Sequence, residues 1–204
     1  KDGADLIFTE YIETQLLKGA GRAYGTEVLL EKKRGAVTGW LGYTLSRTER
    51  HVDGGTRQTR INNGQWYPAN YDKLHDLNLV ANWSISKAWE VGGSFAFQSG
   101  RPITYPDSRA EFEGMYFPVY TNRNGARTPP SHRLDLSATY TLGAQKAQKP
   151  WESSFAFGAY NVYARRNPYS IFFRADFSQP TNVQAYRLSI FGSIIPYFTY
   201  NFNF

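Results

Sequence analysis

The sequence predicts an all-β fold, an antiparallel transmembrane β-barrel of which this chain would supply the last seven strands. Three observations lead to this prediction. Apolar and polar residues alternate in many segments, short and long connections alternate between those segments, and the chain ends on an aromatic stripe. Alternation with a period of two places one set of side chains on each face of a strand. A barrel in lipid needs this division, with apolar residues outside and polar residues inside.

The first two expected strands, residues 24–33 and 37–45, alternate only weakly. The next strands alternate clearly, and their expected lipid-facing positions are apolar, as at Leu77, Leu79 and Trp83. These later strands are residues 77–86, 89–98, 134–142, 151–159 and 196–204. Acidic residues fall on the opposite, lumen-facing positions, and we expect them to be polar wall residues. They are Glu27, Glu31, Glu90, Asp135 and Glu152.

The connections between these strands alternate in length. Residues 34–35, 87–88 and 144–150 form short connections. The others are long, and they are residues 49–74, 99–131 and 163–185. In outer-membrane barrels the short turns face the periplasm and the long loops face the outside. The last strand then runs toward the short turns and places Phe204 in the periplasm.

This topology divides the chain simply. Residues 1–19 would be the end of an extracellular loop, and residues 20–204 would be barrel strands with their long extracellular loops. Within the third long loop, residues 170–176 and 184–190 are rich in Ile, Phe and Tyr. We expect these two segments to form a hairpin above the membrane.

The composition excludes several classes of protein. Aromatic residues make up 17% of the chain, yet the mean hydropathy is -0.52. No run approaches the ~18 consecutive apolar residues of a spanning helix. The absence of Cys excludes a disulfide scaffold and thiolate chemistry. The net charge of +6 comes from scattered Lys and Arg, so we expect no nucleic-acid partner.

Two further features concern the barrel itself. Trp89 and Trp151 each open a strand just after a short turn, the place of an aromatic girdle in a membrane barrel. In a soluble sandwich the same residues would be core, and that alternative stays open. Seven strands are too few to close a membrane barrel, so we expect the remaining strands to come from elsewhere. The chain begins at Lys1 without a signal peptide, so we expect a piece of a longer protein, with a mature, processed product as the alternative.

Several motifs appear in a characteristic order. They are YGTEV at residues 24–28, GWLGYTLSR at 39–47, INNGQWYP at 61–68, SGRP at 99–102, HRLDL at 132–136, YNVY at 160–163 and the terminal Phe. This series resembles the late strands of TonB-dependent outer-membrane receptors, in particular those with an N-terminal carboxypeptidase-regulatory-like domain. The resemblance covers nearly the whole chain.

The resemblance implies a barrel of about 22 strands plugged by an N-terminal domain. It implies uptake of a scarce nutrient, such as a siderophore, vitamin, oligosaccharide or peptide, across the outer membrane of a Gram-negative bacterium with energy supplied through TonB. The implied partners are outer-membrane lipid and lipopolysaccharide, the barrel assembly machinery, TonB through the plug, and a surface lipoprotein. The terminal stripe also resembles the signal that this machinery reads, and its residues are Phe198, Tyr200, Phe202 and Phe204.

The sequence contains no catalytic constellation, so we expect a protein that is not an enzyme and needs no cofactor or resident metal. His51, His75 and His132 lie at no metal-ligand spacing, although a metal or siderophore contact at the rim stays an alternative for the last two. Ligand contact is expected in the long loops, where Arg and aromatic side chains suit anionic, planar or sugar ligands. The candidates are Arg57, Arg60, Trp66, Tyr67, Arg101, Tyr105 and Arg127.

Two other functions remain open at this point. One is a passive or structural outer-membrane barrel. The other is a surface adhesin or enzyme for which the barrel serves only as an anchor. The edge strand of a soluble sandwich is the remaining alternative for the terminal stripe.

Overall fold

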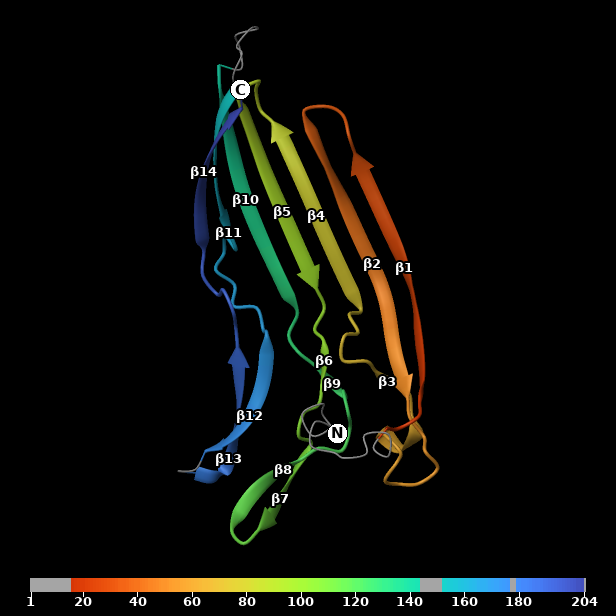
Figure 1. The fold of residues 1–204 in the computed structure, drawn as a ribbon. Coiled ribbons are helices and arrows are strands. Elements are labelled where there is room, and N and C mark those ends of the chain that lie inside the picture. Colours follow the sequence, from red (N-terminus) through yellow and green to blue (C-terminus); the bar gives the residue numbers. More distant parts are fainter. Residues whose placement is uncertain (1–15, 144–151, 177–178, 204) are drawn as a thin grey trace.

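The computed structural model describes residues 16–143, 152–176 and 179–203, and it is built on one large antiparallel sheet (Figure 1). Seven long strands follow one another in the sheet in sequence order. They are β1 (Ala20–Lys32), β2 (Val37–His51), β4 (His75–Ser84), β5 (Trp89–Gln98), β10 (Ser131–Leu142), β11 (Glu152–Tyr160) and β14 (Ile195–Asn203). Each neighbouring pair is antiparallel. The expected all-β, antiparallel architecture is confirmed.

The sheet is open. Within the described residues, no strand pairs with the outer side of β1 or of β14. Both edges therefore carry backbone groups that lack ladder partners in this part of the chain. The described residues form an unclosed sheet, so the expected barrel, and the place of these strands in it, stay predictions.

The two ends of the sheet differ. One end carries the short connections at residues 33–36 and 85–88 and the end of β14, and the other carries the long connections (Figure 1). The long connections contain secondary structure of their own. It comprises β3 (Tyr67–Pro68), which pairs with β2, the pairs β6 (Pro102–Ile103) with β9 (Ala126–Arg127), β7 (Ser108–Phe112) with β8 (Met115–Val119), and β12 (Ser170–Asp176) with β13 (Gln179–Leu188), and a 3-10 turn, η2 (Asn62–Gly64).

The hairpin expected in the third long loop is present. β12 has the predicted bounds, whereas β13 begins at Gln179 rather than at residue 184. The backbone N–H of Tyr169 donates to the carbonyl of Leu188 at 2.9 Å and continues the ladder toward the sheet. This hairpin lies beyond the long-connection end of the sheet (Figure 1).

The first two strands are longer than predicted. β1 begins at Ala20 instead of residue 24, and β2 continues to His51 instead of residue 45. The prediction of a loop from residue 49 was wrong at this boundary. The ladder persists because polar pairs replace apolar ones, as between Arg22 and Glu49, which are cross-strand partners and form an ion pair. Apolar alternation stops there, so the sequence pattern does not mark the strand end.

The register aligns the alternating residues across the whole sheet. One row of cross-strand partners runs Leu30, Leu41, Leu79, Phe95, Leu134, and a second runs Val91, Ala138, Phe157, Phe198. Partners directly opposite each other share a face. The sheet therefore has one continuous apolar face, which we call the apolar face. Of the five acidic residues predicted at lumen-facing positions, Glu27, Glu31, Glu90 and Asp135 lie on the opposite face, the polar face, and the side chain of Glu152 lies outside the described part of the structure.

The polar face has one apolar exception near its β1 edge. Trp40 of β2 is the partner of Val80 of β4, and Leu29 lies on the same face of β1. These three side chains break the division that the later strands keep. They explain why the alternation of the first two strands looks weak in the sequence.

Nothing among the described residues covers the apolar face. Leu79 is 40% exposed, Trp83 52% and Phe198 68%. Within the described residues only three hydrophobic residues are buried, Val52, Tyr67 and Ala69, and all three lie in the first long connection. The sheet has no hydrophobic core of its own.

Aromatic residues gather at the short-turn end of the apolar face. The Trp89 ring lies 4.9 Å from Tyr140 and 6.1 Å from Phe157, centroid to centroid. Trp83 and Tyr200 lie on the same face near that end. Trp89 opens β5 just after a short turn, as predicted, and its place at a membrane interface stays a prediction; Trp151 lies outside the described residues.

Candidate functional site

The candidate site is the layer of long connections at one end of the sheet. We call it the loop layer and define it as residues 52–74 and 99–130 together with residues 161–176 and 179–194. Its three segments are far apart in the sequence, yet polar side chains join them to one another and to the strand ends. Binding residues commonly lie on loops that a rigid scaffold positions. The contacts that fix these loops therefore determine which side chains the site exposes to a ligand.

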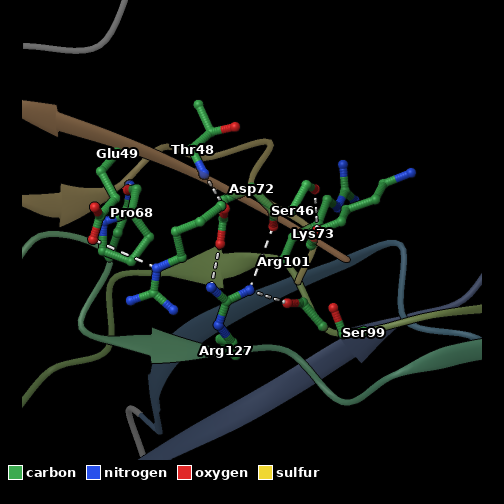
Figure 2. A network of polar contacts seen from close by, with 12 residues as sticks. Ser46, Thr48, Glu49, Pro68, Asp72, Lys73, Ser99, Arg101 and Arg127 are labelled. Atoms are coloured by element: carbon green, nitrogen blue, oxygen red, sulfur yellow. Dashed lines mark hydrogen bonds and ion pairs between the residues drawn. The ribbon is translucent and has the colours of Figure 1, made fainter. Parts of the chain in front are cut away.

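A buried ion pair joins the first two segments (Figure 2). The side chain of Asp72 is fully buried, and its carboxylate pairs with the guanidinium of Arg127. Oδ1 of Asp72 also accepts a hydrogen bond from the backbone N–H of Thr48 at 2.6 Å. Arg127 donates through Nη1 to the carbonyl of Gly100 at 2.9 Å. A buried carboxylate is tolerated only with such partners, so Asp72 fixes β2 and two loops at one point.

Two asparagines form a second link between the same segments. Asn124 is 6% exposed and donates through Nδ2 to the carbonyl of Pro68 at 2.7 Å and to Oδ1 of Asn70 at 2.6 Å. Asn62 donates to the carbonyl of Arg123 at 2.8 Å and accepts from its N–H at 2.7 Å. Both asparagines have positive φ, 56° and 47°, a conformation that Asn tolerates better than most residues.

Asn161 and Asn167 tie the third segment to the sheet. Asn161 is 3% exposed, its N–H donates to Asp135 at 2.8 Å, and its side chain donates to the carbonyls of Arg165, Phe191 and Ser193 at 3.1–3.3 Å. Asn167 both accepts from the N–H of His132 at 3.0 Å and donates to its carbonyl at 2.9 Å. These hydrogen bonds fix the third segment to the sheet both where it leaves β11 and just before it enters β14.

The seven predicted ligand residues occupy different environments. Arg57 is exposed, and the Arg60 guanidinium lies 2.9 Å from Asp53, which lowers the pKa of that carboxyl. Trp66 is 38% exposed and packs under Arg22, whose guanidinium carbon lies 4.2 Å from the ring centre. These three side chains are presented at the surface of the first segment.

The other four hold the loop layer together. Tyr67 is 4% exposed and packs inside the layer. Arg127 is engaged with Asp72, and Arg101 donates to the carbonyl of Tyr169 at 3.1 Å. Tyr105 lies edge-on to Phe173, with centroids 5.1 Å apart. The structure therefore brings these residues to one end of the sheet but spreads them between surface and interior.

A hollow on the polar face lies where the sheet meets the third segment. Its volume is about 360 Å³. The lining residues are Arg133, Tyr160, Asn161, Asn167, Ile190, Phe191 and Ile195. Arg133 is held by Asp135, with Nη2 and Oδ2 2.9 Å apart, and Tyr160 stacks on Tyr197 at 5.0 Å. A guanidinium, amides and aromatic rings in one hollow suit a polar or anionic ligand.

Sequence reasoning did not single out these residues as a site. Arg133, Tyr160 and Asn161 appear in the HRLDL and YNVY motifs, but nothing in the motifs shows that they converge. Their convergence depends on the register of β10 with β11, which places Leu136 opposite Ala159. The signal available in the sequence was the Arg–Asp pair at alternate positions on the polar side of one strand.

The histidines at the sheet end are paired with tyrosines. Nδ1 of His75 lies 2.8 Å from the hydroxyl of Tyr43, and Nδ1 of His132 lies 2.7 Å from that of Tyr163. Within the described residues, no group of three or more His, Asp or Glu is placed to hold a metal ion. A hydrogen-bonded rim residue is therefore the interpretation that the geometry favours for both.

Comparisons with protein-family models, with curated proteins and with solved structures gave no match to this chain. In the described part of the chain, no helix is both long enough and apolar enough to span a membrane.

Proposed function

We propose that this chain forms the C-terminal wall of a transmembrane β-barrel in the outer membrane of a Gram-negative bacterium. The complete protein would be a TonB-dependent receptor that takes up a scarce nutrient. One observation carries the proposal: an apolar face extends across seven antiparallel strands, uncovered by any other described element, while Glu27, Glu31, Glu90 and Asp135 lie on the opposite face.

The physical argument is one of solvent. Burying a Leu or Phe side chain contributes roughly 1.5–3 kcal/mol relative to leaving it in water. The rows through Leu79, Phe95 and Phe157 would forgo that gain at every second position if the face met water. A soluble sandwich gains it from a second sheet, and the described residues contain no second sheet of comparable extent. Lipid supplies the apolar surroundings instead.

The difference between the two ends supports the orientation. Short connections at one end and a structured loop layer at the other are typical of outer-membrane barrels. Trp89 and Tyr140 at the short-turn end suit a membrane interface, where amphipathic rings are enriched. The hollow at Arg133 and the exposed Arg57, Arg60 and Trp66 are the proposed ligand contacts at the opposite end.

The first experiment maps the topology, and it uses the absence of Cys from this chain. A single Cys replaces Thr56 in the loop layer or Lys87 in a short turn of the full-length protein. Intact cells are then treated with a maleimide that cannot cross membranes. We expect labelling of T56C in intact cells and of K87C only after the outer membrane is opened. Equal labelling at both positions would contradict membrane insertion.

The second experiment tests uptake. Growth on limiting ferric siderophores, cobalamin, oligosaccharides and peptides is compared among the parent strain, a strain lacking this protein and a strain lacking TonB. We expect at least one nutrient whose use requires both proteins. Uptake that requires the protein but not TonB would favour a passive barrel. Correct topology with unchanged growth on every nutrient, together with binding to host macromolecules, would favour an adhesin.

A further inference from the structure

The apolar face carries a compact group of charged and aromatic side chains just beyond its apolar rows. Cross-strand pairing places Tyr24 with Arg47 and Arg22 with Glu49 on this face, in continuation of the pairs Thr26–Leu45 and Val28–Tyr43. The guanidiniums therefore lie on the side that the proposed function assigns to lipid. An ordinary lumen-wall role does not account for them.

The level of these residues along the strand is informative. A membrane-spanning strand needs about 9–11 residues. At the short-turn end, β2 begins at Val37, and 9–11 residues counted forward from there end near Arg47. β1 ends at Lys32 at the same end of the sheet, and 9–11 residues counted backward from there reach Tyr24 and Arg22. Arg22 and Arg47 thus lie at the depth of the lipid head groups in the leaflet nearest the loop layer.

The two guanidiniums are held in place by one carboxylate. Arg22 donates from Nε to Oε2 of Glu49 at 2.8 Å, and its Nη2 lies 2.7 Å from the same oxygen. Nε of Arg47 lies 3.5 Å from Oε1. The side chain of Glu49 is 9% exposed, whereas those of Arg22 and Arg47 are 48% and 36% exposed. The group carries one net positive charge, and both guanidinium side chains stay partly exposed.

A hollow of about 520 Å³ adjoins this group. It is lined by Tyr24, Thr26, Leu45, Arg47, Glu49 and Leu74, among others. The lining combines apolar and aromatic side chains with the guanidinium of Arg47, and this combination matches an amphipathic molecule with an anionic head. Trp66, stacked on Arg22, adds a flat ring at the same level, which suits a sugar.

We propose that Arg22, Arg47 and the adjoining hollow bind the phosphorylated glucosamine head of lipid A, the glycolipid of the outer leaflet. This inference rests on the proposed function, because it requires the apolar face to lie in an outer membrane. Guanidinium groups pair bidentately with phosphate, and basic pockets at the membrane surface bind anionic head groups. Glu49 orients both guanidiniums, and the hollow takes the start of an acyl chain.

The test measures the lipid retained by the full-length protein after extraction in mild detergent. The variant carries Arg22→Gln and Arg47→Gln. The control carries Arg34→Gln and Lys87→Gln, which remove the same charge from exposed positions in two short turns. We expect lipid A per protein, measured by mass spectrometry, to fall at least several-fold in the variant and to stay at the parental level in the control. Vesicles containing lipid A should bind the parent protein, and vesicles with dephosphorylated lipid A should not.

The possible outcomes separate the two proposals. Correct cysteine labelling with equal lipid A retention in variant and control would overturn this inference alone. Retention of phospholipid in place of lipid A, or equal binding of the dephosphorylated form, would also overturn it. Failure of the labelling test would remove both proposals. If the double variant does not assemble, single variants are compared instead. R22K and R47K keep the positive charge, so they should retain more lipid A per protein than R22Q and R47Q.

Discussion

In the sheet, large apolar side chains such as Leu79, Trp83 and Phe198 stay 40–68% exposed, whereas in the loop layer Asp72, Asn124 and Asn161 are almost completely buried. The usual distribution of polar and apolar residues is thus reversed between the two regions. The sheet is regular in its hydrogen bonds but depends on its surroundings for apolar contacts. The loop layer is held by specific polar contacts and depends mainly on itself. The two regions should therefore respond to different perturbations.

The largest effect is expected from Arg127→Ala. It leaves the fully buried carboxylate of Asp72 without its cation, a change that costs about 3–5 kcal/mol. Hydrogen–deuterium exchange of the full-length protein should rise in residues 52–74 and 99–130 and stay unchanged in β4 and β5. Arg57→Ala, at an exposed position of the same layer, is the control and should change neither region. Equal loss of protection in sheet and loops would show that the two regions are not independent.

The converse change is Leu79→Arg on the apolar face. If the face lies in lipid, an arginine near mid-membrane costs about 2–4 kcal/mol. The adjacent Asn78→Arg, on the polar face beside Asp76, should cost much less. Unfolding in lipid vesicles by denaturant measures both values. Similar losses for the two variants would mean that the assignment of the faces to lipid and lumen is wrong.

A smaller effect is expected from Phe202→Ser in β14. The Phe202 side chain is 50% exposed on the apolar face at the short-turn end, far from the loop layer. If the aromatic stripe acts in assembly, as its resemblance to an assembly signal implies, the loss of this ring should lower the amount of assembled protein a few-fold. Nutrient uptake per surface-labelled molecule should not change. Asn201→Ser alters the other face of the same strand and is the control. Normal assembly with reduced uptake per molecule would contradict the proposed topology.

The smallest effect concerns pH and one hairpin of the loop layer. Hydrogen bonds from the side chain and backbone N–H of Thr121 lower the pKa of Asp107, which closes the base of the β7–β8 hairpin. A lowered pKa means that this contribution is present above the ordinary value of about 3.9 and is lost as the pH falls through the folded value. A spin label at Glu113→Cys should become more mobile at acid pH. The added substitution Asp107→Asn should remove most of that pH dependence, and an unchanged dependence would show that another group controls the hairpin.

The sequence predicted the sheet well because each strand repeats a local rule. Alternation from Leu77 to Trp83 is visible without knowing any partner, and the register then follows from aligning apolar rows. The ends of β1 and β2 were missed because the ladder continues through Arg22 and Glu49, where the rule no longer holds. The lipid-facing role of these rows remains a prediction.

The loop layer could not be predicted in the same way. Asp72 and Arg127 are 55 positions apart, and Asn62 and Arg123 are 61 apart, with no periodic pattern to connect them. Their roles depend on which loops the sheet brings together. Arg and aromatic composition pointed to the long connections as the place of ligand contact, and that contact stays a prediction. It did not separate exposed Arg57 from Arg127, which is engaged in an ion pair.

The open edges of the sheet have a consequence for assembly symmetry. Because the path from β1 to β14 contains seven strands, its first and last strands run in the same direction. Two copies joined from β14 to β1 would therefore meet as parallel neighbours, so a ring of identical copies cannot keep an antiparallel ladder throughout. Any set of strands that bridges the two edges and pairs antiparallel with both must be odd in number. This arithmetic disfavours a head-to-tail ring of identical copies; if the sheet closes with all copies in one orientation, the bridging strands must come from a different segment, covalently joined to this chain or separate from it.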